Sequence, residues 1–334
     1  MDEKVSILMP VFNAEKTLHE CLQSILNQTH QGFELIAVND NSTDSSTDIL
    51  RSYDDPRFCL FDNREKGIVS ALNLGLEHCQ FDLVARMDAD DVMYATRLEK
   101  QSAMMSKDPS ITLCASKVRK FPEEMIRAGY VEYMRWQNAC VTEQDIKDQI
   151  YIESPFAHPS VMFRRTRILD LGGYRDGEFP EDYELWLRLF HAGESMMKLD
   201  EVLIDWRESD KRLSRTSSRY SEAAFEKLRA EYLAKDNRLQ NRDIIFWGAG
   251  RKTRQRIQYL IDNGIRPSGW IDIDSKKAGN DYHGAKTCLP DSLLRYEDKP
   301  FVLNYVRNHG ARDECRRFLD AAGYIMGVDY LDVA

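Results

Sequence analysis

The segment Leu83–Asp91 reads LVARMDADD and is the most informative part of the sequence about the fold. Its first five residues are apolar apart from Arg86, as expected for a short buried β-strand. Three carboxylates, Asp88, Asp90 and Asp91, then follow where that strand should stop. Carboxylates this close repel one another, and a hard divalent cation such as Mg²⁺ or Mn²⁺ removes the repulsion. An acidic turn that caps the next helix would look the same, so other motifs must decide.

The residues before this stretch alternate between two patterns. Apolar runs at 5–9, 33–38 and 58–61 are each followed by a segment with the apolar spacing of an amphipathic helix. Such alternation predicts a mostly parallel central sheet with helices on both faces. Polar loops at 10–13 and 40–44 fall at the carboxyl ends of strands, as the acidic triplet does. Ligands bind at this edge of such sheets, so we expect the three loops to form one site.

The chain after the acidic loop gives less regular signals. We expect a strand at 111–118, helices of mixed charge at 123–150, and a strand pattern over 154–164. His158 stands at the mouth of that last segment, where it either meets a ligand or makes a structural hydrogen bond.

Two further segments carry candidate site residues. Glu181 and Asp182 follow Pro180 and open a predicted helix, whose dipole favours acids in the first turn. Trp206 and Arg207 end a predicted strand and begin a basic run. That run is either a lid over a diphosphate or a solvated charged segment.

Composition limits the class of protein. The chain has 334 residues and a net charge of −9, with no basic stripe that would indicate nucleic acid as a partner. Its seven cysteines form no Cys-x-x-Cys pair, and no signal peptide or membrane-spanning run is evident, so we expect a cytoplasmic protein. A lipid-linked substrate would then be reached by peripheral contact at the inner face of the membrane.

The last third of the chain predicts a second unit. Residues 219–240 are charged and helical, which indicates a linker. Residues 241–334 begin with a strand, a Gly-Ala-Gly turn at 248–250, a helix and a strand ending at Asp272, as in a dinucleotide-binding βαβ unit. A bound nucleotide and a docking or homo-oligomerisation role both remain open for this unit.

Four segments in order resemble family 2 glycosyltransferases, which have the GT-A fold. Residues 5–13 (VSILMPVFN) resemble the family's opening strand and nucleotide-binding loop, and 38–44 (VNDNSTD) its base-binding segment, with Asn39 in place of the usual first aspartate. Residues 85–91 resemble the metal and diphosphate motif, and 180–182 the Glu-Asp motif of the catalytic base. The resemblance covers roughly the first 215 residues, about the size of one domain.

The resemblance implies a GT-A domain over 1–218, the linker at 219–240 and a Rossmann-like C-terminal domain at 241–334. It implies Asp182 as catalytic base and Mn²⁺ or Mg²⁺ held by Asp90 directly, with Asp88 contacting the ribose or the metal through water. Glu181, His158, Trp206 and Arg207 are acceptor-site or lid candidates. The implied donor-binding residues are Pro10, Val11, Phe12, Asn13, Asp40, Asp88, Ala89 and Asp90.

The function implied is an inverting, metal-dependent transfer of a sugar from a nucleotide-sugar donor, with UDP as the expected nucleotide. The acceptor would be a hydroxyl group of a glycan or of a lipid-linked glycan in cell-envelope polysaccharide synthesis. Two rivals remain open: a nucleotidyltransferase, whose usual Gly-rich loop is missing, and an inactive nucleotide-sugar-binding scaffold.

Overall fold

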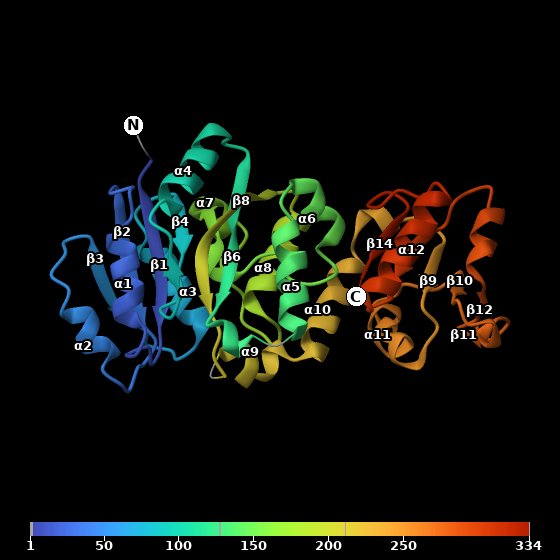
Figure 1. Cartoon of the computed structure of the whole chain (residues 1–334), viewed down its shortest axis with the longest axis horizontal. Coiled ribbons are helices and arrows are strands. Elements are labelled where there is room, and N and C mark those ends of the chain that lie inside the picture. Colours follow the sequence, from blue (N-terminus) through green and yellow to red (C-terminus); the bar gives the residue numbers. More distant parts are fainter. Residues whose placement is uncertain (1–2, 127, 211, 334) are drawn as a thin grey trace. The chain divides into compact units, whose positions relative to one another are not determined.

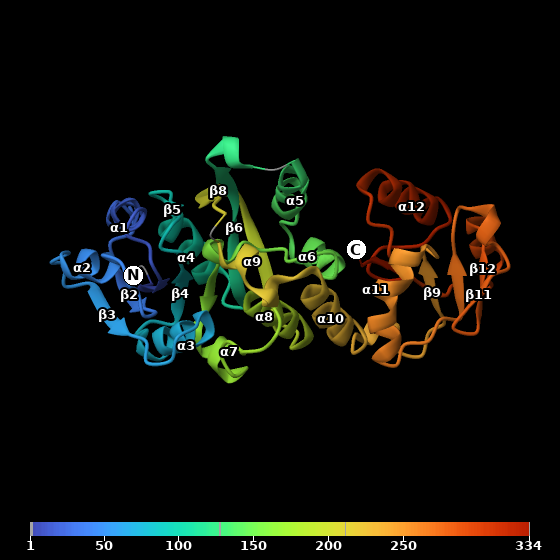
Figure 2. The same cartoon turned by 90° about the horizontal axis from the view of Figure 1, so that it is seen from below.

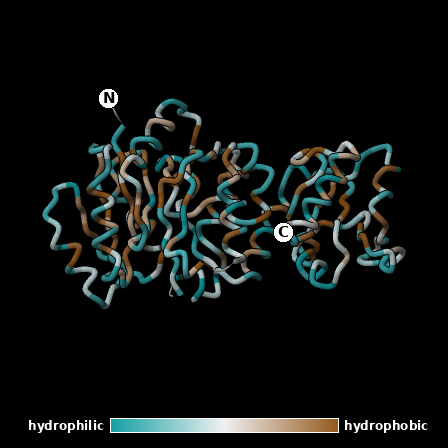
Figure 3. Tube along the Cα trace, in the orientation of Figure 1, coloured by the Kyte–Doolittle hydropathy of each residue, from teal (hydrophilic) through white to brown (hydrophobic). Residues whose placement is uncertain are grey.

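The computed structural model describes residues 3–126, 128–210 and 212–333, and the chain forms two sheets with helices around them (Figure 1). Hydrophobic residues concentrate on the strands inside each unit, while helices and loops carry the polar ones (Figure 3). Within the described ranges, no helix has both the length and the apolar character that crossing a membrane would require.

The chain divides into two compact units. The first comprises Met1–Ile146 and Pro155–Ser217, and the second comprises Lys147–Ser154 and Ser218–Ala334. The second unit therefore includes a short segment from the middle of the sequence as well as the C-terminal third. Helix α10, Glu222–Leu233, belongs to the second unit, in the region where the sequence predicts a linker.

The first unit contains an eight-stranded mixed sheet in the order β3-β2-β1-β4-β7-β6-β8-β5. The four strands from β3 to β4 are parallel, as is the pair β6 and β8, whereas β7 and β5 run antiparallel to their neighbours. The mostly parallel GT-A sheet expected from the sequence is thus confirmed. The strands are β1 Val5–Val11, β2 Phe33–Asn39, β3 Phe58–Asp62, β4 Leu83–Arg86, β5 Val92–Met93, β6 Ile111–Phe121, β7 Met162–Arg164 and β8 Ser195–Arg207.

Helices cover both faces of this sheet (Figure 2). Alternate residues of β1 pack in one core with α1 and α4, while Leu8 of β1 faces α3 on the other side. A Cβ atom on Gly75 of α3 would lie 2.1 Å from Leu8 Cδ1, so glycine lets this helix approach the sheet closely. The helices are α1 Leu18–Leu26, α2 Ser46–Arg51, α3 Ile68–His78, α4 Arg97–Lys107, α5 Ala128–Ala139, α6 Glu143–Gln149, α7 Arg165–Asp170, α8 Glu181–His191 and α9 Leu213–Thr216.

One predicted strand is shorter than the sequence pattern suggested. Only Met162–Arg164 of the 154–164 segment pairs in the sheet, as β7. His158–Ser160 instead forms a 3-10 turn, which is stabilised where Ser160 Oγ donates a hydrogen bond to Ala157 O at 2.7 Å. The prediction was wrong there because a buried apolar run has no periodicity that separates strand from turn.

The second unit contains a six-stranded sheet in the order β11-β12-β10-β9-β13-β14, parallel except for β11. The Gly-Ala-Gly turn lies between β9 and α11, and the Asp272 carboxylate accepts a hydrogen bond from Ala249 N at 2.9 Å and pairs with Lys277 Nζ. Its elements, besides α10, are β9 Ile244–Trp247, α11 Arg251–Asp262, β10 Gly269–Ile271, β11 Asp281–Tyr282, β12 Ala285–Cys288, β13 Phe301–Asn304, α12 His309–Ala321 and β14 Tyr330–Asp332.

Candidate active site

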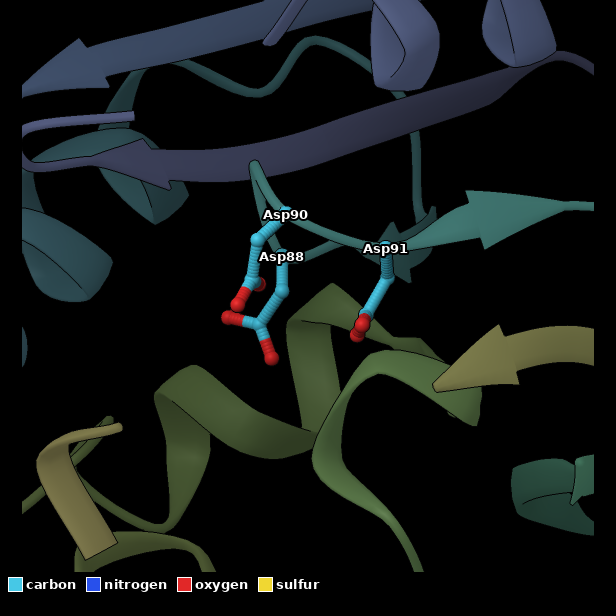
Figure 4. Close-up of side chains that lie close together, drawn as sticks. All are labelled: Asp88, Asp90 and Asp91. Atoms are coloured by element: carbon cyan, nitrogen blue, oxygen red, sulfur yellow. The ribbon is translucent and has the colours of Figure 1, made fainter. Parts of the chain in front are cut away.

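The three aspartates after β4 lie close together. Carboxylate oxygens of Asp88, Asp90 and Asp91, one from each residue, lie within 4.8 Å of one another. Asp88 and Asp90 turn toward each other and Asp91 stands slightly apart on the same side of the loop (Figure 4). Helix α4 begins only at Arg97, so Asp91 does not cap it, contrary to one of the sequence readings.

The electrostatics of this cluster fit a divalent cation. Burial and then the neighbouring Asp88 raise the pKa of Asp90 to about 6, and burial followed by Asp90 and Asp88 raises the pKa of Asp91 further above its usual range. Asp91 Oδ2 is buried and accepts no hydrogen bond from the described residues. Crowded, desolvated carboxylate oxygens are the donor set that Mg²⁺ and Mn²⁺ prefer.

Two arginines contact the acidic loop. The buried Arg86, the last residue of β4, forms an ion pair with Asp88 through Nη1. Arg207, at the end of β8, donates from its backbone N to Asp91 Oδ1 at 2.7 Å and from Nε to Asp90 O at 2.6 Å. Its guanidinium also pairs with Glu20. Arg207 therefore contacts the acidic loop from the end of a strand.

The loops after β1 and β2 are joined by hydrogen bonds. Asn13 Oδ1 accepts from Thr43 N at 2.8 Å, and Asn13 N donates to Ser42 Oγ at 3.1 Å. Asn13 has a φ of 50°, a conformation that asparagine tolerates better than most residues. Pro10 and Val11 are buried in β1, whereas Phe12 beside them is 47% exposed and has Lys66 Nζ 4.5 Å from its ring centre.

Asp40 lies at the carboxyl end of β2, and its carboxylate already accepts hydrogen bonds from other residues of the protein. Its carboxylate accepts from Gly67 N at 2.8 and 3.1 Å and from Asn63 Nδ2 at 2.8 Å. A carboxylate has about four acceptor positions, so capacity remains for one further donor. Ala89, the remaining donor-site candidate, is buried and its carbonyl accepts from Thr17 Oγ1 at 3.2 Å.

Glu181 and Asp182 begin α8, and the His158 turn lies close to Glu181. His158 Nδ1 lies 3.9 Å from Glu181 Oε1, and His158 Nε2 is 2.9 Å from Tyr174 Oη. Burial, then the charge of Glu181, raises the pKa of Asp182 to about 7, while Arg86 acts to lower it. Burial and Arg86 lower the pKa of His158 well below its usual range, so the imidazole is neutral.

Arg86 thereby relates the two acidic clusters in space. Arg86 N donates to Val161 O at 3.0 Å, directly after the His158–Ser160 turn. In that turn, His158 Nδ1 lies 3.9 Å from Glu181 Oε1. Burial raises the pKa of Asp90 and that of Asp182, and the charge of Arg86 opposes part of both increases. The acids of 88–91 and 181–182, nearly a hundred residues apart in sequence, therefore converge on one region of the first unit.

The turn before α8 holds Tyr174 through its backbone. Asn73 of α3 accepts from Tyr174 N at 2.8 Å and donates to Tyr174 O at 2.8 Å. Arg188 of α8 donates to Gly173 O at 2.8 Å and pairs with the buried Glu184. These contacts fix the tyrosine hydroxyl that hydrogen-bonds to His158. Sequence reasoning missed this arrangement because a Gly-Gly-Tyr segment signals only a turn.

We expect Gly173→Ala to destabilise the first unit by about 1–3 kcal/mol, since φ is +67° there and a side chain is strained in that conformation. A Cβ atom would also lie 2.7 Å from Asn73 Oδ1 and displace the amide that holds Tyr174. Urea unfolding measures the loss. Gly193→Ala is the matched control, because Gly193 has a φ of +76° but open space around the position of a Cβ atom. Equal losses in the two variants would show that the Asn73 contact is unimportant.

The segment after β8 is tied down by buried ion pairs. Glu208 pairs with Lys120 and with Arg215, and all three side chains are buried or nearly so. Lys120 Nζ lies 4.5 Å from the centre of the Trp206 ring, and the Arg212 guanidinium lies 4.3 Å from it. Two residues of the basic run, Arg212 and Arg215, therefore make contacts within the folded unit, so the run is not a fully solvated segment.

The comparisons with known proteins agree with this geometry. The model of glycosyl transferase family 2 matches residues 6–172, half of the chain. The chain is 30% identical to the UDP-Gal:alpha-D-GlcNAc-diphosphoundecaprenol beta-1,3-galactosyltransferase of Escherichia coli, over 69% of this chain and 82% of that protein. Among solved structures it resembles S. aureus TarS 1-349 in complex with UDP-GlcNAc, with a TM-score of 0.55 and 16% identity over 78% of this chain and 80% of the other.

A second solved structure has the same fold. It is the mannosyltransferase PcManGT from Pyrobaculum calidifontis in complex with GDP-Man and Mn²⁺, with a TM-score of 0.51 and 17% identity over 79% of this chain and 69% of that one. Fold and site thus define a GT-A glycosyltransferase. The chain belongs to glycosyl transferase family 2 and is an enzyme of that class.

Proposed function

We propose that the protein transfers a sugar from a UDP-sugar to a hydroxyl group of a glycan or lipid-linked acceptor, with inversion at the anomeric carbon and with a divalent metal. The observation that carries the proposal is the crowding of Asp88, Asp90 and Asp91 directly after β4. The end of β4 is hydrogen-bonded to Val161 beside the His158 turn, which in turn contacts Glu181. The aspartate cluster suits a metal-bound diphosphate, and Glu181–Asp182 suits an incoming hydroxyl group.

The donor would lie along the carboxyl edge of β1, β2 and β4. The exposed ring of Phe12 offers a stacking face for the base, and the free acceptor position of Asp40 suits a base N–H. The preference for UDP is supported by the galactosyltransferase relative and by the UDP-GlcNAc complex of TarS, whose names give that nucleotide.

The diphosphate would be held at Asp88 and Asp90, with Asp91 behind them. Bound there, Mn²⁺ or Mg²⁺ would neutralise the negative charge that develops on the leaving diphosphate. The crowding of Asp88, Asp90 and Asp91 supports this role for the aspartates, as does the Mn²⁺ in the PcManGT complex.

Asp182 would act as the general base for the acceptor hydroxyl group. A carboxylate in a buried setting, with a pKa near 7, is well matched to accepting a proton at neutral pH. Glu181, whose Oε1 lies 3.9 Å from His158 Nδ1, would lie beside it and position the acceptor. The diphosphoundecaprenol substrate named for the Escherichia coli relative supports a lipid-linked acceptor.

The test is a thermal-shift screen of UDP-, GDP- and dTDP-sugars with and without Mn²⁺. We expect a UDP-sugar to raise the Tm of the first unit only when the metal is present. At a ligand concentration 100 times Kd the stabilisation is about 2.7 kcal/mol.

Three results would count against parts of the proposal. Stabilisation that survives chelation would exclude the metal role, and a response to GDP- or dTDP-sugars alone would correct the donor. Release of UMP rather than UDP from the donor would instead indicate nucleotidyl transfer.

A further inference from the structure

Arg97, the first residue of α4, is fully buried and donates hydrogen bonds only to neutral acceptors among the described residues. Its Nη2 donates to Arg86 O at 2.9 Å and to Val161 O at 3.1 Å, and its Nε donates to Gln101 Oε1 at 2.9 Å. Burial, followed by the charge of Arg86, lowers the pKa of Arg97 to about 9, so the group is protonated at neutral pH. Burying a charge without a paired carboxylate is costly, and an apolar side chain of similar size would fill the space at lower cost. The directional hydrogen bonds are therefore what this arginine contributes.

Gln101 lies one helical turn after Arg97 and is also fully buried. Its Nε2 donates to Cys114 O of β6 at 2.7 Å and to Ser160 O, in the turn that carries His158, at 2.9 Å. Residues four apart face the same side of a helix, so the two side chains can act together. The pair therefore joins α4 to the end of β4, to β6 and to the 158–161 segment.

The segments that this pair joins lead to the two acidic groups of the site. Arg86 is followed two residues later by Asp88 of the acidic loop. Val161 directly follows the turn of His158, whose Nδ1 lies 3.9 Å from Glu181 Oε1. One buried nitrogen donates to the carbonyl groups of both Arg86 and Val161, and so fixes where one segment lies relative to the other.

Each half of the site also has contacts of its own. The carbonyl groups of the acidic loop accept hydrogen bonds from α1 and β8: Asp88 O from Cys21 Sγ at 3.3 Å, Ala89 O from Thr17 Oγ1 at 3.2 Å, and Asp90 O from Arg207 Nε at 2.6 Å. On the other side, Asn73 holds the backbone of Tyr174. Removal of the arginine and glutamine of α4 should therefore leave the shape of the acidic loop intact and change its placement.

We infer that Arg97 and Gln101 are positioning residues that set the placement of the acidic loop relative to the acceptor-side acids. Both are fully buried, so they act through the backbone of Arg86, Ser160 and Val161 and touch no substrate. Alignment matters in such a reaction, since a misplacement of about 1 Å can cost roughly 10²-fold in rate. The inference rests on the proposed function, because it takes the two acidic groups as halves of one transferase site.

The test compares Arg97→Met, Gln101→Met and the double variant with the wild type. The rate measured is the hydrolysis of UDP-glucose, UDP-galactose or UDP-N-acetylglucosamine with Mn²⁺, in which water attacks the anomeric carbon, its proton passes to the base and UDP leaves. Calorimetry with UDP and Mn²⁺ gives Kd and the number of competent sites. We expect kcat per competent site to fall by about tenfold or more in each variant, while Kd stays close to the wild-type value.

The double variant should lose no more activity than the more impaired single variant, because the two side chains act as one unit. It replaces both partners by apolar side chains of similar shape, so neither is left with an unpaired polar group. It therefore serves as the test if a single variant does not fold.

Arg164→Met is the matched control. Arg164 also donates to two backbone carbonyl groups, Ile111 O at 3.0 Å and Met105 O at 2.8 Å. It pairs with Leu83 at the start of β4, however, at the opposite end of that strand from the acidic loop. This variant should lose stability and keep the wild-type kcat per competent site.

An unchanged kcat per competent site in the double variant would overturn the inference, because the pair would then serve folding alone. A parallel loss of kcat and of UDP affinity would also overturn it, since the acidic loop itself would be distorted, as would an equal loss of kcat in Arg164→Met. If the wild type hydrolyses none of the three donors, the proposed function fails instead, and this is seen before any variant is compared.

Discussion

Asp182→Asn should lower kcat by about 10³-fold while leaving donor binding intact, since a positioned general base contributes roughly 10²- to 10⁴-fold. The amide has nearly the same shape as the carboxyl group and can still accept the 2.7 Å hydrogen bond from Tyr183 N. Folding should therefore be preserved, and the loss should lie in the chemical step. Initial rates of sugar transfer measure kcat, and the Tm increase with UDP and Mn²⁺ measures donor binding.

The pH dependence of the wild-type rate is an independent test of Asp182 as the general base. Only the carboxylate form of Asp182 can accept a proton, and burial together with Glu181 raises its pKa to about 7. The value of kcat/KM should therefore fall as the pH drops below 7 and level off above about pH 8. An acid limb near pH 4, typical of an exposed aspartate, would contradict the assignment.

The control for this variant is Asp170→Asn, an exposed aspartate at the end of α7. It should transfer sugar at the wild-type rate. If Asp182→Asn were as active as this control, the base would have to be another group. If the wild type were inactive with every donor, an inactive binding scaffold would become the better description of this chain.

Asp90→Ala should abolish the metal-dependent stabilisation by UDP and lower activity by about 10³-fold or more. The predicted metal contact is worth several kcal/mol in the transition state, and each 1.36 kcal/mol is tenfold in rate. The variant also relieves crowding, since Asp90 is a main contributor to the raised pKa of Asp91. The apo protein should therefore be as stable as the wild type or slightly more so.

Thermal shifts with UDP and Mn²⁺, alone and together, separate these effects. Asp54→Ala, an exposed aspartate before β3 and away from the acidic loop, should keep the full response. If Asp90→Ala kept the Mn²⁺-dependent shift, the metal would bind elsewhere and the donor-loop assignment would be wrong.

Much of the fold could be predicted because its signals are local. The apolar runs of β1, β2 and β4 and the amphipathic spacing of α1 depend on neighbouring residues alone. Parallel strands then place their carboxyl ends on one edge, so the location of the loops that carry Asn13, Asp40 and Asp88 on that edge followed from topology. The short strand β5 and the His158 turn could not be predicted, since two or three residues carry no usable period.

The family, the alternation that builds the first sheet and the acidic residues at its strand ends all follow from residue type and order. Which side chains meet depends instead on the folded chain. It paired Arg86 with Asp88, tied Asp40 to Gly67, and set Tyr174 against His158. Such contacts join residues far apart in the chain, and their geometry follows from strand register and helix packing, which no local pattern contains.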